Sequence, residues 1–170
     1  MEPHVSFSRA GAADIPVLRA LAGRIWREYY PGIITPEQIE YMLERMYSAP
    51  VLEEEIRSSE RVFELALVEG KPAGFLAYAW EPGNREVKLA KLYLEASRRG
   101  LGIGRRMLAR VRDAARALGA REISLYVNRN NARALRAYLA FGFETGEAVV
   151  KDIGGGFVMD DYILRLTLGG

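Results

Sequence analysis

Apolar positions in the first third of the chain recur every three or four residues, the spacing of one face of an α-helix. Residues 14–30 carry such a stripe and predict an amphipathic helix. A second helix is predicted over residues 35–47. Its start is marked by Thr35 as N-cap, Pro36 at the first helical position and Gln38 as the glutamine of a capping box.

The pattern then changes to alternation, with glycine, proline and asparagine at the turns, which is typical of an antiparallel meander. From residue 95 onward, helical and strand patterns alternate, which is typical of a mixed sheet covered on its faces. The predicted fold is therefore α/β (α+β), with a mixed central sheet of about seven strands flanked by about four helices. The remaining predicted elements are strands at 5–9, 62–68, 73–81, 86–94, 122–127, 147–153 and 157–168, helices at 105–118 and 131–141, and a short helical piece at 52–57.

Composition narrows the classes of function. With 170 residues, 49% of them hydrophobic, residues 1–170 are expected to form a single domain. There is no cysteine and His4 is the only histidine, which excludes disulfides, histidine triads and zinc sites, so we expect no metal. The sequence lacks a secretion signal and a long apolar run, so we expect a cytoplasmic protein without a membrane partner.

Nucleic acid is not an expected partner either. The net charge is +2, and basic residues alternate with acidic ones through most of the chain. An RNA-associated domain would instead need arginines clustered with exposed aromatic side chains on one face, whereas the arginines here follow the helices.

The strongest chemical signal is a glycine-rich loop between a predicted strand and a predicted helix. Glycines let backbone amides approach an anion, and the N-terminus of a helix favours negative charge, so a pyrophosphate fits. Arg105 stands where a dinucleotide-binding fingerprint needs glycine, and no Lys-Ser/Thr pair follows as a P-loop requires. A tight turn with close packing of strand and helix is the alternative interpretation. The loop consists of Arg99, Gly100, Leu101, Gly102, Ile103 and Gly104.

A second motif lies downstream, at the start of the helix predicted over residues 131–141. Asn131 can cap this helix, and Tyr138 lies two turns further along the same stripe, so both side chains can face one ligand. Without the glycine loop, Asn131 would be read as a cap and Tyr138 as a core residue. Phe141, Gly142 and Phe143 close the motif.

Together the two motifs resemble those of the GNAT acetyltransferase superfamily, R-x-x-G-x-G followed by N-x-x-A-x-x-x-Y-x-x-x-G-F. The resemblance implies acetyl-CoA as cofactor, with the pyrophosphate on the loop amides. It also implies that the strand before the loop splays from the parallel strand at 122–127 and pairs with the pantetheine arm. The implied cofactor-binding residues are Leu92, Tyr93, Leu94, Arg99, Gly100, Leu101, Gly102, Ile103, Gly104, Arg105, Asn131 and Tyr138.

The implied reaction is direct attack of an amine on the thioester in a ternary complex. A phenol has a pKa of roughly 10 and a thiol one of roughly 8.5, so Tyr138 is protonated at neutral pH and can serve as general acid. A backbone amide near Leu92 would hold the oxyanion. Glu86 is the candidate base, acting through water, and the alternative is that it is a solvated acid at a strand end.

The acceptor is expected to be a primary amine of a small molecule or a peptide. The segment at 29–43 resembles the PaiA-like branch of the superfamily, some members of which acetylate polyamines. The resemblance is also compatible with a homodimer. An alternative function is a non-catalytic acyl-CoA-binding sensor or scaffold with the GNAT fold. Aromatic residues that could line an acceptor pocket, or serve as core residues, are Trp26, Tyr29, Tyr30, Tyr78 and Trp80.

Overall fold

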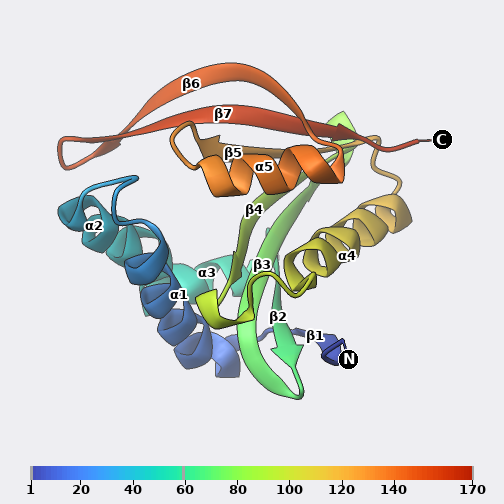
Figure 1. Cartoon of the computed structure of the whole chain (residues 1–170), viewed down its shortest axis with the longest axis horizontal. Coiled ribbons are helices and arrows are strands. Elements are labelled where there is room, and N and C mark those ends of the chain that lie inside the picture. The colour runs from blue at the N-terminus through green and yellow to red at the C-terminus, as the bar shows by residue number, and fades with distance from the viewer. Residues whose placement is uncertain (1, 59, 170) are drawn as a thin grey trace.

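The computed structural model describes residues 2–58 and 60–169 (Figure 1). Three short 3₁₀ turns, Ala12–Asp14, Pro82–Asn84 and Ala96–Arg98, connect the longer elements. The helices are α1 (Ile15–Tyr29), α2 (Pro36–Tyr47), α3 (Ala49–Arg57), α4 (Ile103–Leu118) and α5 (Ala132–Phe141). The strands are β1 (Val5–Arg9), β2 (Val62–Val68), β3 (Lys71–Glu81), β4 (Glu86–Leu94), β5 (Glu122–Asn128), β6 (Glu144–Gly154) and β7 (Phe157–Thr167).

All seven strands form one sheet in the order β1-β2-β3-β4-β5-β7-β6. The first four strands are an antiparallel meander, β4 and β5 are parallel, and β7 lies antiparallel between β5 and β6. The predicted mixed sheet with one parallel pair is therefore confirmed. Five helices flank it rather than about four, because the short piece predicted at 52–57 is a helix of nine residues that begins at Ala49.

Two apolar cores lie on opposite faces of this sheet. Alternate side chains of a strand point to opposite faces, so β3 and β4 contribute to both cores. Figure 1 shows α1, α2 and α3 on one side of the central strands and α4 on the other. The core under α1–α3 contains Leu18, Trp26, Leu52 and Phe75, and the core under α4 and α5 contains Leu76, Met107, Val111, Ile123 and Leu164.

The start of α2 differs from the prediction in one respect. Thr35 is the N-cap, and its Oγ1 accepts a hydrogen bond from the backbone N–H of Gln38 at 3.2 Å, as expected. The predicted capping box is wrong, because the side-chain amide of Gln38 donates instead to the carbonyl of Val158 at 2.8 Å. This bond joins α2 to the β6–β7 hairpin.

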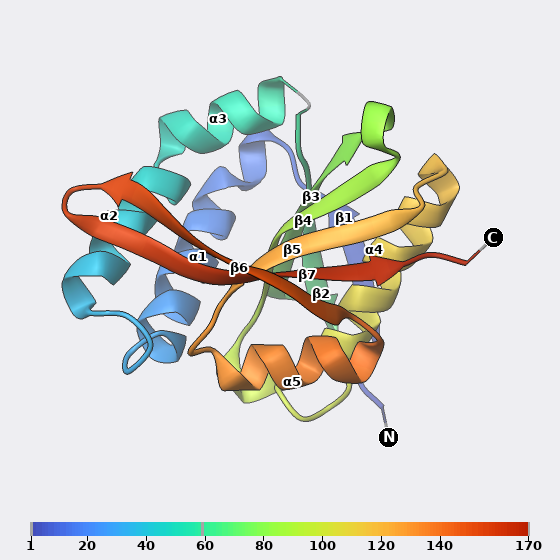
Figure 2. The same ribbon diagram turned by 90° about the horizontal axis from the view of Figure 1, so that it is seen from above.

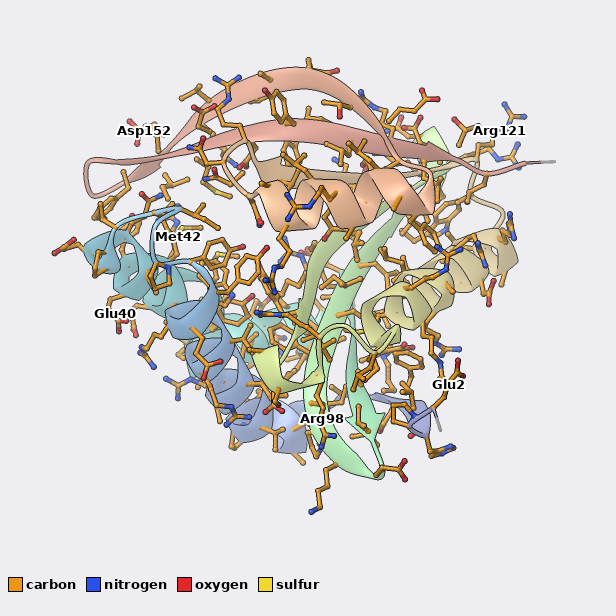
Figure 3. All side chains as sticks on the ribbon, in the orientation of Figure 1. Glu2, Glu40, Met42, Arg98, Arg121 and Asp152 are labelled. Carbon is orange, nitrogen blue, oxygen red and sulfur yellow. The ribbon has the colours of Figure 1, made fainter. Side chains whose placement is uncertain are left out.

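The β6–β7 hairpin leans over α2, as the view from above shows (Figure 2). The hydroxyl of Tyr41 donates to the carbonyl of Ile153 at 2.7 Å, and the ring of Tyr41 lies 5.0 Å from that of Phe157. Figure 3 places Asp152 of the hairpin on the same side of the molecule as Met42 of α2. Helix α2 is thus fixed to strands that follow it by more than a hundred residues.

One glycine of the meander is required by close packing. A Cβ on Gly74 would lie 2.3 Å from the carbonyl oxygen of Tyr93 and 3.2 Å from the Cα of Leu94, both backbone atoms that cannot move aside cheaply. We predict that Gly74→Ala lowers the free energy of unfolding by about 2–3 kcal/mol, measured by urea denaturation. Gly11→Ala is the matched control, because a Cβ there meets nothing within 4 Å. Equal stabilities for the two variants would contradict this account of β3–β4 packing.

Candidate active site

Six consecutive backbone amides are free at the beginning of α4. In the part of the chain that the structure describes, the amides of residues 100–105 donate to no protein acceptor. The first hydrogen bond of this turn runs from the N–H of Arg106 to the carbonyl of Gly102 at 3.2 Å. The positive end of the helix dipole adds to these donors. The loop is therefore built to receive an anion.

The three glycines of this loop do not serve close packing. Gly100 and Gly102 have φ of +80° and +77°, a left-handed conformation that favours glycine. Gly104 lies in the first turn of α4, and a Cβ at any of the three positions would meet nothing within 4 Å. The tight turn explains two of the glycines, and the open space beside all three leaves room for a ligand.

Arg99 braces the loop against α1. One of its guanidinium nitrogens donates to the carbonyl of Leu94 at 3.2 Å, and the guanidinium carbon lies 4.7 Å from the centre of the Tyr29 ring. Burial, followed by the nearby charge of Arg133, lowers the pKa of Arg99. Two positive charges therefore face one pocket of about 250 Å³, which is lined by Glu28, Tyr29, Ile33, Arg99, Asn131, Ala132 and Arg133.

Arg105 is exposed and lies on α4 beside α5. Its guanidinium carbon is 5.6 Å from the centre of the Phe141 ring. The structure therefore brings Arg105 next to the second motif as well as the loop.

Strands β4 and β5 pair at one end and then diverge. Their parallel register covers only residues 86–88 of β4, opposite 122–124 of β5, although β4 continues to Leu94. At Ala90 a bulge adds one residue to β4, because Leu89 and Lys91 oppose the adjacent β3 residues Tyr78 and Ala77. The β5-facing edge of β4 thus has no partner strand over residues 92–94, immediately before the anion-binding loop, and the carbonyl of Leu94 accepts its hydrogen bond from Arg99 instead.

Asn131 is the N-cap of helix α5 and follows the end of β5 by three residues. Its side-chain oxygen accepts a hydrogen bond from the N–H of Ala134 at 3.2 Å, so the predicted cap is confirmed. The same oxygen accepts a hydrogen bond from the hydroxyl of Tyr29, and Asn131 is 5% exposed. This residue therefore ties α1 to α5 at the edge of the pocket.

Tyr138 lies two turns further along α5 and is half-buried against Phe143, with ring centres 5.6 Å apart. Burial raises the pKa of Tyr138, and the nearby Tyr30 and Tyr29 act in the same direction. The hydroxyls of Tyr30 and Tyr93 lie 3.0 Å apart, and burial raises the pKa of Tyr30 to about 12. These phenols are therefore all protonated at neutral pH.

The model of the Acetyltransferase (GNAT) family matches residues 21–143. The chain belongs to this family. The matched residues include the anion-binding loop, the β4–β5 gap and the whole of α5, so the sites described above lie within the family's own region.

Individual relatives agree with this assignment. An uncharacterised N-acetyltransferase of Mycobacterium tuberculosis is 30% identical over 77% of this chain and 83% of its own length. The spermidine N(1)-acetyltransferase of Thermoplasma acidophilum is 26% identical over 92% of this chain and 96% of its own length. The crystal structure of PaiA N-acetyltransferase from the same organism, in complex with coenzyme A, has a TM-score of 0.82 at 25% identity and covers 97% of this chain and 99% of that one. The GNAT chain is thus an N-acetyltransferase, as its motifs predict.

The predicted acceptor residues are divided between the two faces of the sheet. Trp26, Tyr29 and Tyr30 lie on α1 or at its end, where Trp26 is 2% exposed and its ring centre is 4.5 Å from that of Tyr30. Tyr78 and Trp80 belong to the core under α4 and α5. The structure therefore joins Tyr29 to Asn131 by a hydrogen bond, whereas Tyr78 and Trp80 share with Tyr138 the core under α4 and α5.

Glu86 lies at the paired end of β4, eight residues before the loop-side end of the strand. Its carboxylate accepts a hydrogen bond from the hydroxyl of Ser124 on β5, and its backbone pairs with Glu122. The structure thus places Glu86 where β4 and β5 are still joined, beside the gap rather than next to the anion-binding loop.

Besides Glu64, which is paired with Arg110, the sequence analysis missed two further buried charged residues. Lys91 of β4 is 2% exposed, its ammonium lies 4.7 Å from the centre of the Tyr47 ring, and burial lowers its pKa to about 8. Asp161 of β7 is 6% exposed, and burial raises its pKa to about 6. Both residues lie in strands where apolar and polar positions alternate. Only the pairing register of the strands shows that these two side chains point inward.

Among the described residues, no helix is both long enough and apolar enough to span a membrane.

Asn131 offers a test of how the pocket edge is held. We predict that Asn131→Ala lowers the free energy of unfolding by about 1 kcal/mol, because the start of α5 loses its cap and Tyr29 loses its acceptor. Asn131→Asp retains an acceptor oxygen at this position and should lose less. Guanidinium denaturation of the three proteins measures the difference, and equal losses for both variants would rule out the capping role.

Proposed function

We propose that residues 1–170 work as a single acetyltransferase domain that transfers an acetyl group from acetyl-CoA to a primary amine of a small molecule or peptide. The observation that carries the proposal is the row of six free amides beside an unpaired strand edge. A diphosphate has the charge and oxygen acceptors that the amides need, and an amide-containing arm has the groups that the strand edge needs. Coenzyme A contains both parts.

The residues present fit this cofactor. The amides of residues 100–105 would hold the pyrophosphate, with Arg99 and Arg105 adding positive charge near it. The edge of β4 over Leu92, Tyr93 and Leu94, which has no partner strand, would pair with the pantetheine arm, and Asn131 would face that arm from the other side of the gap. Support comes from the open space beside the glycines and from the coenzyme A complex of the similar PaiA protein.

Acetyl-CoA would supply an acetyl thioester to this gap. Tyr138 would donate its hydroxyl proton to the departing sulfur, a role that its raised pKa permits because the phenol remains protonated at neutral pH. A backbone amide of β4 near Leu92 would stabilise the negative oxygen that develops on the carbonyl. Glu86, held by Ser124, is the proposed base and would take the proton of the amine through water.

The acceptor would enter from the side of α1 and the β6–β7 hairpin, where Tyr29 and Tyr30 are available. Polyamines are the class favoured by the similar spermidine N(1)-acetyltransferase and by the resemblance to the PaiA-like branch. A screen for thiol release over polyamines, amino acids, aminoglycosides and peptide amines tests the proposal. Binding of acetyl-CoA without thiol release from any amine would instead support the sensor or scaffold alternative.

Gly104→Asp separates ligand binding from folding. An aspartate in the first turn of α4 suits the helix dipole and meets open space, so the free energy of unfolding should stay the same or rise by about 0.5 kcal/mol. The same charge should repel a diphosphate and raise the dissociation constant of coenzyme A at least tenfold, measured by calorimetry. Gly83→Asp adds an equal charge in open space away from the loop and is the matched control. Similar affinities for both variants would show that the loop does not bind the diphosphate.

Tyr138→Phe tests the general acid. The substitution removes the hydroxyl and keeps the ring packed against Phe143, so the dissociation constant of acetyl-CoA should change less than threefold. Turnover, followed by thiol release, should fall by about a hundredfold or more. Because burial raises the pKa of Tyr138, the wild-type enzyme should show no loss of rate from ionisation of this phenol below pH of about 10. Unchanged turnover in Tyr138→Phe would remove this residue from the reaction.

A further inference from the structure

Asp161 is a negative charge inside the protein that the described residues leave without a counter-ion. It is 6% exposed. Within residues 2–58 and 60–169, its carboxylate takes part in no side-chain hydrogen bond and no ion pair. The neighbouring cation Arg129 is paired with Asp160 instead, at 3.3 Å. A buried carboxylate in this condition needs an explanation, since such groups are almost always paired.

The register of the sheet shows where this carboxylate points. Asp161 is opposite Asn128 of β5 and Val149 of β6. It shares a face of β7 with Met159, which packs against the core under α1–α3, whereas Tyr162 and Leu164 belong to the other face. Asp161 therefore faces the side of the sheet from which the acceptor would enter.

Tyr30 links Asp161 to the rest of the site. Burial is the main cause of the raised pKa of Tyr30, and the negative charge of Asp161 acts in the same direction. Tyr30 in turn lies 3.0 Å from the hydroxyl of Tyr93 and is near Tyr138. The phenol of Tyr30 thus interacts electrostatically with both Asp161 and the proposed general acid.

The energetics favour a ligand that brings positive charge. Burial disfavours the ionised form of Asp161, yet its pKa of about 6 leaves it ionised at neutral pH. A cationic ligand would replace the missing counter-ion and recover part of the desolvation energy. An apolar or neutral acceptor would leave the carboxylate of Asp161 without a counter-ion.

We propose that Asp161 is the counter-ion for a second, non-reacting ammonium group of the acceptor, and that the acceptor is therefore a diamine or polyamine. The inference rests on the proposed acetyltransferase function and adds a residue that selects the substrate. It assigns Asp161 a role in binding and none in the transfer of the acetyl group.

The other charged and titratable groups around Asp161 do not take over this role. Tyr30, the C-cap of α1, is neutral at neutral pH, and Asp160 is paired with Arg129. Lys151 of β6 lies opposite Met159, on the same face of the sheet as Asp161. It is exposed and forms no ion pair within the described chain. Asp160→Asn is therefore a matched control, because it removes an equal charge one residue away.

The experiment compares Asp161→Asn with Asp160→Asn. Calorimetry on protein saturated with coenzyme A measures binding of spermidine, which has additional ammonium groups, and of butylamine, which has one. Asp161→Asn should raise the dissociation constant of spermidine at least tenfold and that of butylamine less than threefold. Asp160→Asn should change both less than threefold. In the thiol-release assay, Asp161→Asn should raise KM for spermidine while kcat stays within threefold.

Dependence on pH gives a second readout. Wild-type affinity for spermidine should fall as the pH drops through about 6, where Asp161 becomes neutral, and Asp161→Asn should lack this change. The variant should also have a higher Tm above pH of about 6, because it no longer buries a charge. This gain should vanish as the pH falls to about 4, the unfolded pKa of aspartate, where both proteins are neutral at this position.

Three results would overturn the inference. One is an unchanged dissociation constant for spermidine in Asp161→Asn. Another is a collapse of kcat with KM unchanged, which would place Asp161 in the reaction itself. The third is a wild-type protein that releases thiol with other amines and does not bind spermidine, an outcome that leaves the acetyltransferase proposal intact. Failure to release thiol with any amine, while spermidine binding still depends on Asp161, would count against the proposed function instead.

Discussion

The divergence of two parallel strands is the constraint on which the site depends. β4 and β5 share three residue pairs and then separate, so the central sheet is interrupted in its middle rather than at an edge. Unpaired backbone groups inside a protein are costly unless water or a ligand satisfies them. The gap between the strands is therefore a natural place for an extended ligand, and the bulge at Ala90 changes the orientation of β4 where the gap opens.

The two sides of this gap have different chemistry. On the side of the glycine loop, free amides and the dipole of α4 make the surroundings positive, and Arg99 and Arg133 add formal charge. Toward β7, the buried carboxylate of Asp161 makes the surroundings negative. The protonated phenols of Tyr30, Tyr93 and Tyr138 add neutral hydrogen-bonding groups to the site. An anionic cofactor and a cationic acceptor would thus be drawn to opposite sides of the point where they meet.

Local patterns predicted most of the fold. The strands at 5–9, 62–68 and 86–94 have the predicted bounds, because alternation and turn residues define them without help from distant segments. The turn before β3 is shorter than predicted, since Glu69 and Gly70 alone take positive φ and Lys71 already pairs with Val68. The glycine loop was also visible, because its chemistry is carried by consecutive residues.

The sequence could not show which residues lie on the same face of the central sheet. Trp26 and Tyr78 look alike in a pattern of apolar positions, yet they lie in different cores. Alternation shows that Asp160 and Asp161 point in opposite directions, but it does not show which one points inward. That depends on the pairing of β7 with β5 and β6, which is a long-range contact. The same limit hid the bond from Gln38 to Val158, which replaced a local capping box.

The position of β7 in the sheet has a consequence for the folding of the enzyme. This strand is the last in the chain, yet it is inserted between β5 and β6 and carries the carbonyl that holds α2. During synthesis the loop of α4 and the helix that carries Tyr138 leave the ribosome first. β7 follows both of them, so the bond that fixes α2 to the hairpin can form only after β7 has been made.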